Sequence, residues 1–281
     1  MQRHLWGATH FQVPLIGQGT WYLEAADRRT AITTLRRGLD LGMTHIDTAE
    51  MYGAGEAERI VGEAIAGRRD QVFLVSKVLP QNASRSGTQA ACERSLARLK
   101  TDRLDCYLLH WRGPHPLEDT VASFESLLRA GMIRSWGVSN FDVDDLEELR
   151  RVDAGKNCAC NQVLYNLEQR AIEHAVLPWC ESHAVAVTAY SPFGHGEFPP
   201  ARTPKGRVLA QIAATYGGTP RQVALAFLSR RPSLFAIPKA SSSAHAEENA
   251  GAGELRLSEA EIHSIDAAFP RGPRPESLPV L

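Results

Sequence analysis

Four side chains of the sequence could together donate a proton to a carbonyl group: Asp47, Tyr52, Lys77 and His110. A tyrosine phenol, with an ordinary pKa of about 10, is a poor acid at neutral pH. A neighbouring ammonium lowers that pKa, and a carboxylate beside the ammonium keeps it charged and oriented. A histidine within reach could orient the carbonyl oxygen. The four residues therefore predict proton donation in carbonyl reduction, for which a hydride donor is still required.

Each of these residues also has an ordinary structural explanation. Asp47 and Lys77 could form an ion pair that only stabilises the fold, His110 could be an interior histidine, and Tyr52 could pack in a loop. Their joint placement at the ends of successive strands favours the functional interpretation. Glu50 lies between Asp47 and Tyr52, and the sequence leaves open whether it touches the substrate or faces solvent.

Short apolar segments of strand length alternate with segments of helical periodicity along the whole chain. The predicted strands are residues 13–20, 43–47, 70–77, 103–110, 132–140, 158–166, 184–191 and 234–239. Predicted helices include 27–42, 86–102 with Ser86 as its cap, 117–131, 141–155, 173–184 and 203–218. Such alternation with apolar strands is typical of a parallel sheet covered by helices.

We predict an α/β fold, a single (β/α)8 barrel of the TIM type with its site at the C-terminal face of the strands. One domain would span residues 1–281, with about residues 270–281 as an extended tail, because no composition break or long linker interrupts the chain. A doubly wound sheet is disfavoured. GQGTWY, at the first strand, lacks the third glycine and the following helix of the dinucleotide-binding fingerprint.

Polar side chains occur at the end of strand after strand. They are Asp47, Lys77, His110, Ser139 with Asn140, Gln162, Tyr190 with Ser191, and Lys239. In a barrel these ends converge on one rim, where barrel enzymes carry their active sites. The sequence thus predicts a polar pocket independently of any resemblance.

The composition excludes several classes of function. Lys plus Arg number 31 and Asp plus Glu 32, which gives a net charge of −1. The sequence has no basic patch with interleaved aromatic residues of the kind that binds nucleic acid. Five cysteines show no disulfide spacing, which is typical of reduced core residues. No signal peptide is recognisable, and no apolar run approaches the roughly 18 residues that a membrane span needs. We therefore predict a cytoplasmic chain without a membrane or nucleic-acid partner.

Seven motifs, in order, resemble the aldo-keto reductases. They are HIDTAEMYG, VSKV, LLHW, GVSNF, NQVLYN, YSPFG and IPKASS followed by EEN, and the match runs from IGQGTW almost to the C-terminus. Each motif alone is weak, but seven in order are a strong signal. The resemblance implies a (β/α)8 barrel that binds a nicotinamide cofactor and reduces aldehydes and ketones.

The resemblance also implies roles for individual residues. Tyr52 would be the general acid, Lys77 and Asp47 would lower its pKa, and His110 would orient the substrate oxygen. The implied cofactor-binding residues are Gly19, Thr20, Asp47, Ser139, Asn140, Gln162, Tyr190, Ser191, Pro192, Phe193, Gly194, Ile237, Lys239, Ser241, His245, Glu248 and Asn249.

Within that set the parts of the cofactor are divided along the chain. The nicotinamide carboxamide would be held by Ser139, Asn140 and Gln162, and Tyr190 would stack on its ring. Residues 191–194 would hold the pyrophosphate. The adenosine end would be held by Lys239, Ser241, Glu248 and Asn249.

The chain departs from the family pattern at two positions. Many members that prefer NADPH have a serine after the lysine and an arginine six residues past it, where this chain has Ala240 and His245. Lys239 and the hydroxyls of residues 241–243 could still bind a 2′-phosphate, but the bidentate arginine is lost. We expect NADPH to be preferred, less strongly than with arginine, and NADH to be usable.

The substrate pocket is less clearly encoded. Trp21, Trp111 and Phe193 follow strands and are predicted walls, and the short loops suggest an open pocket for small, reactive carbonyls. The 237–249 segment and the length are most similar to bacterial methylglyoxal-reductase-type members. Two alternatives are a cofactor-binding regulatory module similar to channel β subunits, and a metal hydrolase using His110 and His115. We predict no metal, and a monomer rather than an oligomer.

Overall fold

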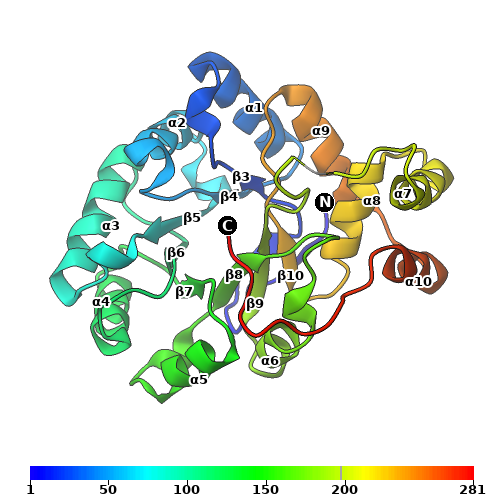
Figure 1. The fold of residues 1–281 in the computed structure, drawn as a ribbon. Coiled ribbons are helices and arrows are strands. Elements are labelled where there is room, and N and C mark those ends of the chain that lie inside the picture. The colour runs from blue at the N-terminus through cyan, green and yellow to red at the C-terminus, as the bar shows by residue number, and fades with distance from the viewer. Residues whose placement is uncertain (197) are drawn as a thin grey trace.

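Eight parallel strands form the centre of the computed structural model, which describes residues 1–196 and 198–281 (Figure 1). In chain order, and as neighbours in the sheet, they are β3 (Gln18–Gly19), β4 (His45–Asp47), β5 (Phe73–Val78), β6 (Cys106–Leu109), β7 (Trp136–Ser139), β8 (Cys160–Leu164), β9 (Ala186–Tyr190) and β10 (Leu234–Ala236). Hydrogen bonds from Gly17 N to Ala236 O (2.8 Å) and from Gly19 N to Pro238 O (3.1 Å) join the first strand to the last. The predicted (β/α)8 barrel is confirmed.

Helices surround the sheet. Those that follow successive strands are α1 (Arg28–Asp40), α2 (Glu56–Ala64), α3 (Arg85–Leu99), α4 (Leu117–Arg129), α5 (Val143–Arg151), α6 (Val176–Ser182), α8 (Pro220–Leu228) and α9 (Ser243–Gly251). Two further helices, α7 (Pro204–Thr215) and α10 (Glu259–Ala268), pack on each other outside α8 (Figure 1). Helix α1 shows the principle, because its periodic Leu35 and Leu39 are buried against the barrel.

Several predicted helix ends were wrong by a few residues; for example, α6 begins at Val176 rather than at residue 173, and α7 ends at Thr215 rather than at residue 218. Ser84 rather than Ser86 caps α3: its backbone is extended, and its Oγ accepts a hydrogen bond from Gly87 N (3.1 Å). Helix α5 ends at Arg151 because Val152 adopts an extended conformation. Gly155, the predicted end, lies in a separate 3-10 turn, where a Cβ atom would lie 1.8 Å from Leu149 O.

The predicted first strand, residues 13–20, was also wrong in part. Its first residues belong to β2 (Gln12–Pro14), which pairs antiparallel with β1 (Arg3–Leu5), and only β3 joins the barrel. The hairpin brings Trp6 onto three rings at the amino-terminal ends of the strands. Its ring centroid lies 5.2 Å from that of His45, 5.0 Å from Phe73 and 4.9 Å from Phe235. An aromatic cluster therefore closes this end of the barrel.

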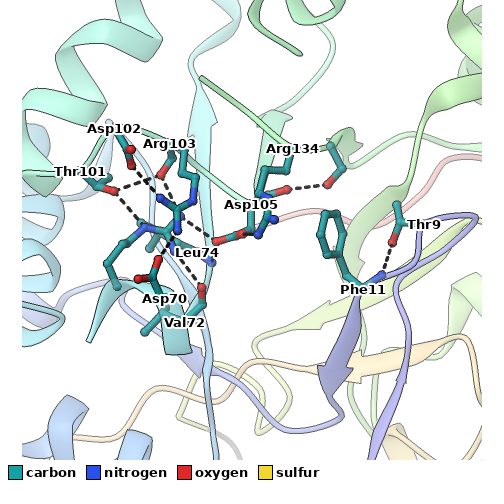
Figure 2. A network of polar contacts seen from close by, with 12 residues as sticks. Thr9, Phe11, Asp70, Val72, Leu74, Thr101, Asp102, Arg103, Asp105 and Arg134 are labelled. Atoms are coloured by element: carbon teal, nitrogen blue, oxygen red, sulfur yellow. Dashed lines mark hydrogen bonds and ion pairs between the residues drawn. The ribbon is translucent and has the colours of Figure 1, made fainter. Parts of the chain in front are cut away.

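A polar network around Asp105 also lies at the amino-terminal end, just before β6 (Figure 2). The buried carboxylate accepts a hydrogen bond from Leu74 N (2.9 Å) and pairs with Arg69 (2.8 Å) and Arg134 (3.2 Å). Arg134 in turn lies over the ring of Phe11, 5.1 Å from its centroid. These contacts bind the start of β5 to the start of β6, at the opposite end of the barrel from the predicted site.

Candidate active site

A cavity of about 450 Å³ opens at the carboxyl ends of the strands, where the sequence places the site. Most of the predicted site residues line it: Gly19, Thr20, Trp21, Asp47, Tyr52, His110, Trp111, Ser139, Asn140, Gln162, Tyr190, Ser191, Pro192, Phe193, Gly194, Ile237 and Lys239. Every strand of the barrel or the loop that follows it contributes a residue to this arrangement, if the buried Lys77 of β5 is included.

Lys77 lies beneath the cavity, fully buried, and connects the predicted catalytic residues. Its Nζ donates to Asp47 Oδ1 (2.5 Å), to Thr48 O (2.9 Å) and to the Tyr52 hydroxyl (3.1 Å). Asp47 is 1 % exposed, so the ion pair is shielded from solvent. Neighbouring parallel strands bring the two together, since Asp47 ends β4 and is paired in register with Val75 of β5. All three donors of the ammonium are thereby used.

A second set of hydrogen bonds connects Asp47 to the other side of the barrel. Gln162 Nε2 donates to Asp47 Oδ2 (2.7 Å). The backbone oxygen of Gln162 accepts from Ser139 Oγ (2.8 Å) and from Asn140 N (2.9 Å). Asn140 Oδ1 accepts from the Tyr190 hydroxyl (2.9 Å). The residues expected to hold a carboxamide and a ring are thus fixed relative to the ion pair.

Burial dominates the electrostatics of Tyr52. Burial and the nearby Asp47 carboxylate raise the pKa of the Tyr52 phenol above its ordinary value, although Lys77 opposes this. Lys77 lowers this pKa as predicted, but Asp47 raises it rather than lowering it, and burial makes the net shift upward. Burial alone would lower the pKa of the Lys77 amine, but Asp47 and Tyr52 raise it above its usual value. At neutral pH the site holds a protonated phenol beside a charged ammonium.

His110 stands over Tyr52 as a neutral ring. The ring centroids lie 5.8 Å apart in an edge-to-face arrangement. Burial, and then the positive charge of Lys77, lower the pKa of His110 well below its ordinary value. Its Nδ1 is buried and has no hydrogen-bond partner among the described residues. A neutral imidazole can donate from one nitrogen only, which suits it to orient a carbonyl oxygen.

Left-handed backbone conformations surround the cavity. Directly after Tyr52, Gly53 and Ala54 have φ of 55° and 52°, and Asn140 and Ser191 have φ of 61° and 48°. Such residues cost about 1 kcal/mol or more each when they are not glycine, and they are common at functional sites. At Gly53 a side chain would also collide with Glu24, 2.5 Å from the Cβ position.

Most of the residues predicted for the adenosine end of the cofactor lie beyond the cavity. Lys239 lines it, whereas Ser241, His245, Glu248 and Asn249 do not. Ser241 Oγ lies 2.9 Å from His245 Nδ1, which is exposed in the first turn of α9. The structure thus places Lys239 and Ser241 in the segment between β10 and α9, His245 in the first turn of α9, and Glu248 and Asn249 further along α9.

Five cavity residues escaped the sequence analysis: Tyr22, Met51, His195, Gly196 and Leu281. Tyr22, Met51 and His195 are each adjacent in sequence to a predicted residue, and Gly196 is two residues from Gly194; this proximity could have identified them. Trp21, a predicted wall, stacks on Tyr22 with centroids 4.7 Å apart and lies 5.6 Å from the His195 ring. Leu281 reaches the cavity because the tail returns over the barrel, as Figure 1 shows for the C-terminus. No local pattern encodes that return.

The structure also decides the position of Glu50, which neither lines the cavity nor faces solvent. It is 8 % exposed, and its Oε1 accepts hydrogen bonds from Leu79 N (2.8 Å) and Asn82 Nδ2 (2.9 Å).

The donor set of the cavity fits a nicotinamide dinucleotide. Amide and hydroxyl groups of Ser139, Asn140 and Gln162 match a carboxamide, and the Lys239 ammonium matches a phosphate. Gly194 has a φ of 71° and open space at its Cβ position, so its backbone is uncovered and able to approach a pyrophosphate.

The described residues contain no group of three or more His, Cys, Asp or Glu side chains that could hold a metal ion. His115, the second histidine of the metal-hydrolase alternative, has its Nε2 3.2 Å from Gln81 O. Across residues 1–196 and 198–281, no helix is both long and apolar enough to span a membrane. All five cysteines are free and buried.

Comparison with known proteins gives consistent matches over nearly the whole chain. The sequence pattern of the Aldo/keto reductase family matches residues 15–269. Methylglyoxal reductase YeaE of Escherichia coli is 47% identical over 260 residues, 92% of each chain. Glyoxal reductase of Bacillus subtilis is 32% identical, covering 95% of this chain and 94% of the relative. An aldo/keto reductase from Klebsiella pneumoniae, solved in complex with NADP and acetate, is 43% identical, with a TM-score of 0.94 and all of both chains covered.

Proposed function

The chain belongs to the aldo/keto reductase family as an NADPH-dependent carbonyl reductase, and we propose that it reduces small reactive carbonyls such as methylglyoxal, with Tyr52 as the general acid. The similarity to methylglyoxal and glyoxal reductases supports this substrate class. The cavity of about 450 Å³ supports it too, since it is lined by Trp21 and Trp111 as well as by Tyr52 and His110, and aromatic walls suit a short carbonyl compound.

When bound, NADPH supplies the hydride that the side chains of the protein lack. Ser139, Asn140 and Gln162 would hold its carboxamide, and Tyr190, whose hydroxyl is fixed by Asn140, would support the ring. The backbone of residues 191–194 would hold the pyrophosphate. Lys239 at the edge of the cavity, with Ser241 and His245 beyond it, would hold the 2′-phosphate, and Glu248 and Asn249 would lie nearby.

The protein's own contribution to the reaction is to orient the carbonyl and to donate a proton. His110 would orient the carbonyl oxygen towards the Tyr52 hydroxyl. As the oxygen gains negative charge, Tyr52 transfers its phenolic proton to it and completes the alcohol. The phenolate that remains is stabilised by the Lys77 ammonium, which Asp47 holds charged and in place. Gln162 orients the Asp47 carboxylate from the other side.

The single observation that carries this proposal is the buried contact between Lys77 Nζ and the Tyr52 hydroxyl at the base of the cavity. Burying a lysine beside one carboxylate and one phenol costs desolvation free energy, and such costly groups in a cavity are typical of functional sites.

The test is the loss of NADPH absorbance with methylglyoxal and a panel of aromatic aldehydes, on the wild type and on Tyr52→Phe. The variant should lose about 10²- to 10⁴-fold in kcat while binding NADPH as before. Undiminished turnover in Tyr52→Phe would refute the assignment of the acid. Cofactor binding without turnover of any carbonyl by the wild type would instead favour the regulatory-module alternative.

The chain-level expectations belong to the same proposal. We propose one barrel domain over residues 1–281 with an extended segment from about residue 270, and a monomer in solution. Light scattering of the purified protein would test the oligomeric state.

A further inference from the structure

Glu50 connects the two segments that carry Tyr52 and Lys77. It lies two residues before Tyr52, and its Oε1 accepts hydrogen bonds from Leu79 N (2.8 Å), two residues after Lys77, and from Asn82 Nδ2 (2.9 Å). The guanidinium of Arg94 lies 3.7 Å from Oε2. The carboxylate therefore holds the loop after β4 against the loop after β5.

The backbone alone provides only part of this alignment. Beyond the end of β4, Thr48 N donates to Val75 O (2.9 Å), and Glu50 N reaches Lys77 O at the longer distance of 3.4 Å. The chain then leaves the strand direction, and Gly53 and Ala54 turn it in left-handed conformations. At this point the hydrogen bonds of the Glu50 side chain take the place of backbone hydrogen bonds between the segments that follow β4 and β5.

Resting on the proposed function, we propose that Glu50 is a positioning residue: by bridging the β4 and β5 loops it sets the separation of the Tyr52 hydroxyl from Lys77 Nζ. It does not touch the cavity, so it would act on the reaction only through Tyr52. A displacement of about 1 Å in a reacting group can cost about 10²-fold in rate, so a contact of this kind has a measurable effect.

The chain offers a matched control at the other end of the same strand. Asp105 is also a buried carboxylate, with a side chain 4 % exposed against 6 % for Glu50. It accepts a hydrogen bond from Leu74 N at the start of β5 (Figure 2). Glu50 accepts one from Leu79 N just past the end of the same strand. Loss of either carboxylate leaves a backbone N–H of the β5 region unpaired, but only Glu50 is near Tyr52.

We would compare Glu50→Ala, Glu50→Gln and Asp105→Ala with the wild type. Both alanine variants should melt at lower temperature. Only Glu50→Ala should lose kcat, by about tenfold or more, with the KM for methylglyoxal and the Kd for NADPH within about twofold. Glu50→Gln keeps an acceptor oxygen for Leu79 N and should recover kcat to within about threefold of the wild type.

The pH dependence of kcat gives a readout that general destabilisation would not move. Lys77 favours the Tyr52 phenolate, so separating the two raises the pKa of Tyr52 further, and the basic limb of the kcat profile should shift to higher pH in Glu50→Ala alone. Equal losses of kcat in Glu50→Ala and Asp105→Ala, or an unshifted basic limb, would overturn the proposal.

A measurement without turnover separates this inference from the proposed function. In protein labelled with 3-fluorotyrosine, the Tyr52 fluorine resonance is identified by its absence in Tyr52→Phe. The resonance should move in Glu50→Ala and stay in place in Asp105→Ala, whether or not a carbonyl is reduced. An unmoved resonance in Glu50→Ala refutes the positioning role, whereas a moved resonance in a protein that reduces no carbonyl supports it and refutes only the proposed reaction.

Discussion

His45 should make the protein lose stability as the pH falls below neutrality. The side chain is fully buried in the aromatic cluster at the amino-terminal end of the barrel, and neither ring nitrogen has a hydrogen-bond partner among the described residues. Burial, and then the charge of Lys77, lower the pKa of His45 to about 3. In the unfolded chain its pKa returns to about 6.5, so at mildly acidic pH the unfolded state binds a proton that the folded state does not bind.

The magnitude follows from the two pKa values. The folded form keeps the ring neutral, so the stability is complete above the unfolded pKa and falls from about pH 6.5 towards pH 3. Between about pH 7.5 and pH 5, proton binding stabilises the unfolded state by about 2 kcal/mol, and the free energy of unfolding falls by the same amount. The result changes little if the folded pKa is 3 or 4, because both lie below the range that is measured.

The assay is urea unfolding at the two pH values, with the free energy of unfolding extrapolated to water. His45→Gln carries no titrating group there, so it should lose about 2 kcal/mol less than the wild type between about pH 7.5 and pH 5. Each protein is compared with itself, so the cost of the substitution at neutral pH does not enter. The exposed His263→Gln is the control and should follow the wild type. Equal losses in wild type and His45→Gln would refute the reasoning.

Three further predictions concern the site and its surroundings. Lys77→Met should lower the free energy of unfolding by about 3–5 kcal/mol, because Asp47 is left buried without its cation, and adding Asp47→Asn should restore part of it; denaturant unfolding without any recovery in the double variant would contradict this. Ala54→Gly should raise the free energy of unfolding by about 0.5–1 kcal/mol, since φ is 52° there, and a lower melting temperature would count against it. His245→Arg should lower the Kd for NADPH, because a guanidinium can bind the 2′-phosphate in a bidentate manner; an unchanged Kd would remove His245 from this role.

The barrel and most of the cavity could be predicted because both depend on local, repeated signals. Apolar strands alternate with amphipathic helices, and a polar residue such as Gln162 or His110 lies in the last part of most strands or directly after them. Once the strands are parallel and closed, those ends must meet. Asp47 and Lys77 are far apart in sequence, but their places at the ends of neighbouring strands determine their contact.

Other features could not be predicted from the sequence because they depend on tertiary packing. The pKa of Tyr52 rises because of its burial, and the extent of burial is decided by every element around the cavity. Leu281 reaches the cavity through the path of an irregular tail. The prediction merged β2 with the first barrel strand, because the apolar residues 13–16 lead directly into β3. The contact of Glu50 with Leu79 N is a side-chain to backbone bond, for which no residue type at position 79 gives a signal.

The junction of β3 with β10 has a consequence for the order in which the molecule forms and comes apart. It joins segments near opposite ends of the chain, as the packing of α1 on α9 also does, and β3 contributes two residues to it. Bringing such distant segments together carries the largest loss of chain entropy of any strand pairing here. It should therefore form late in folding and exchange its amide hydrogens early. The cavity is lined by Gly19 on one side of this junction and by Ile237 and Lys239 on the other. A molecule bound across them would therefore stabilise the closed barrel against separation of β3 from β10.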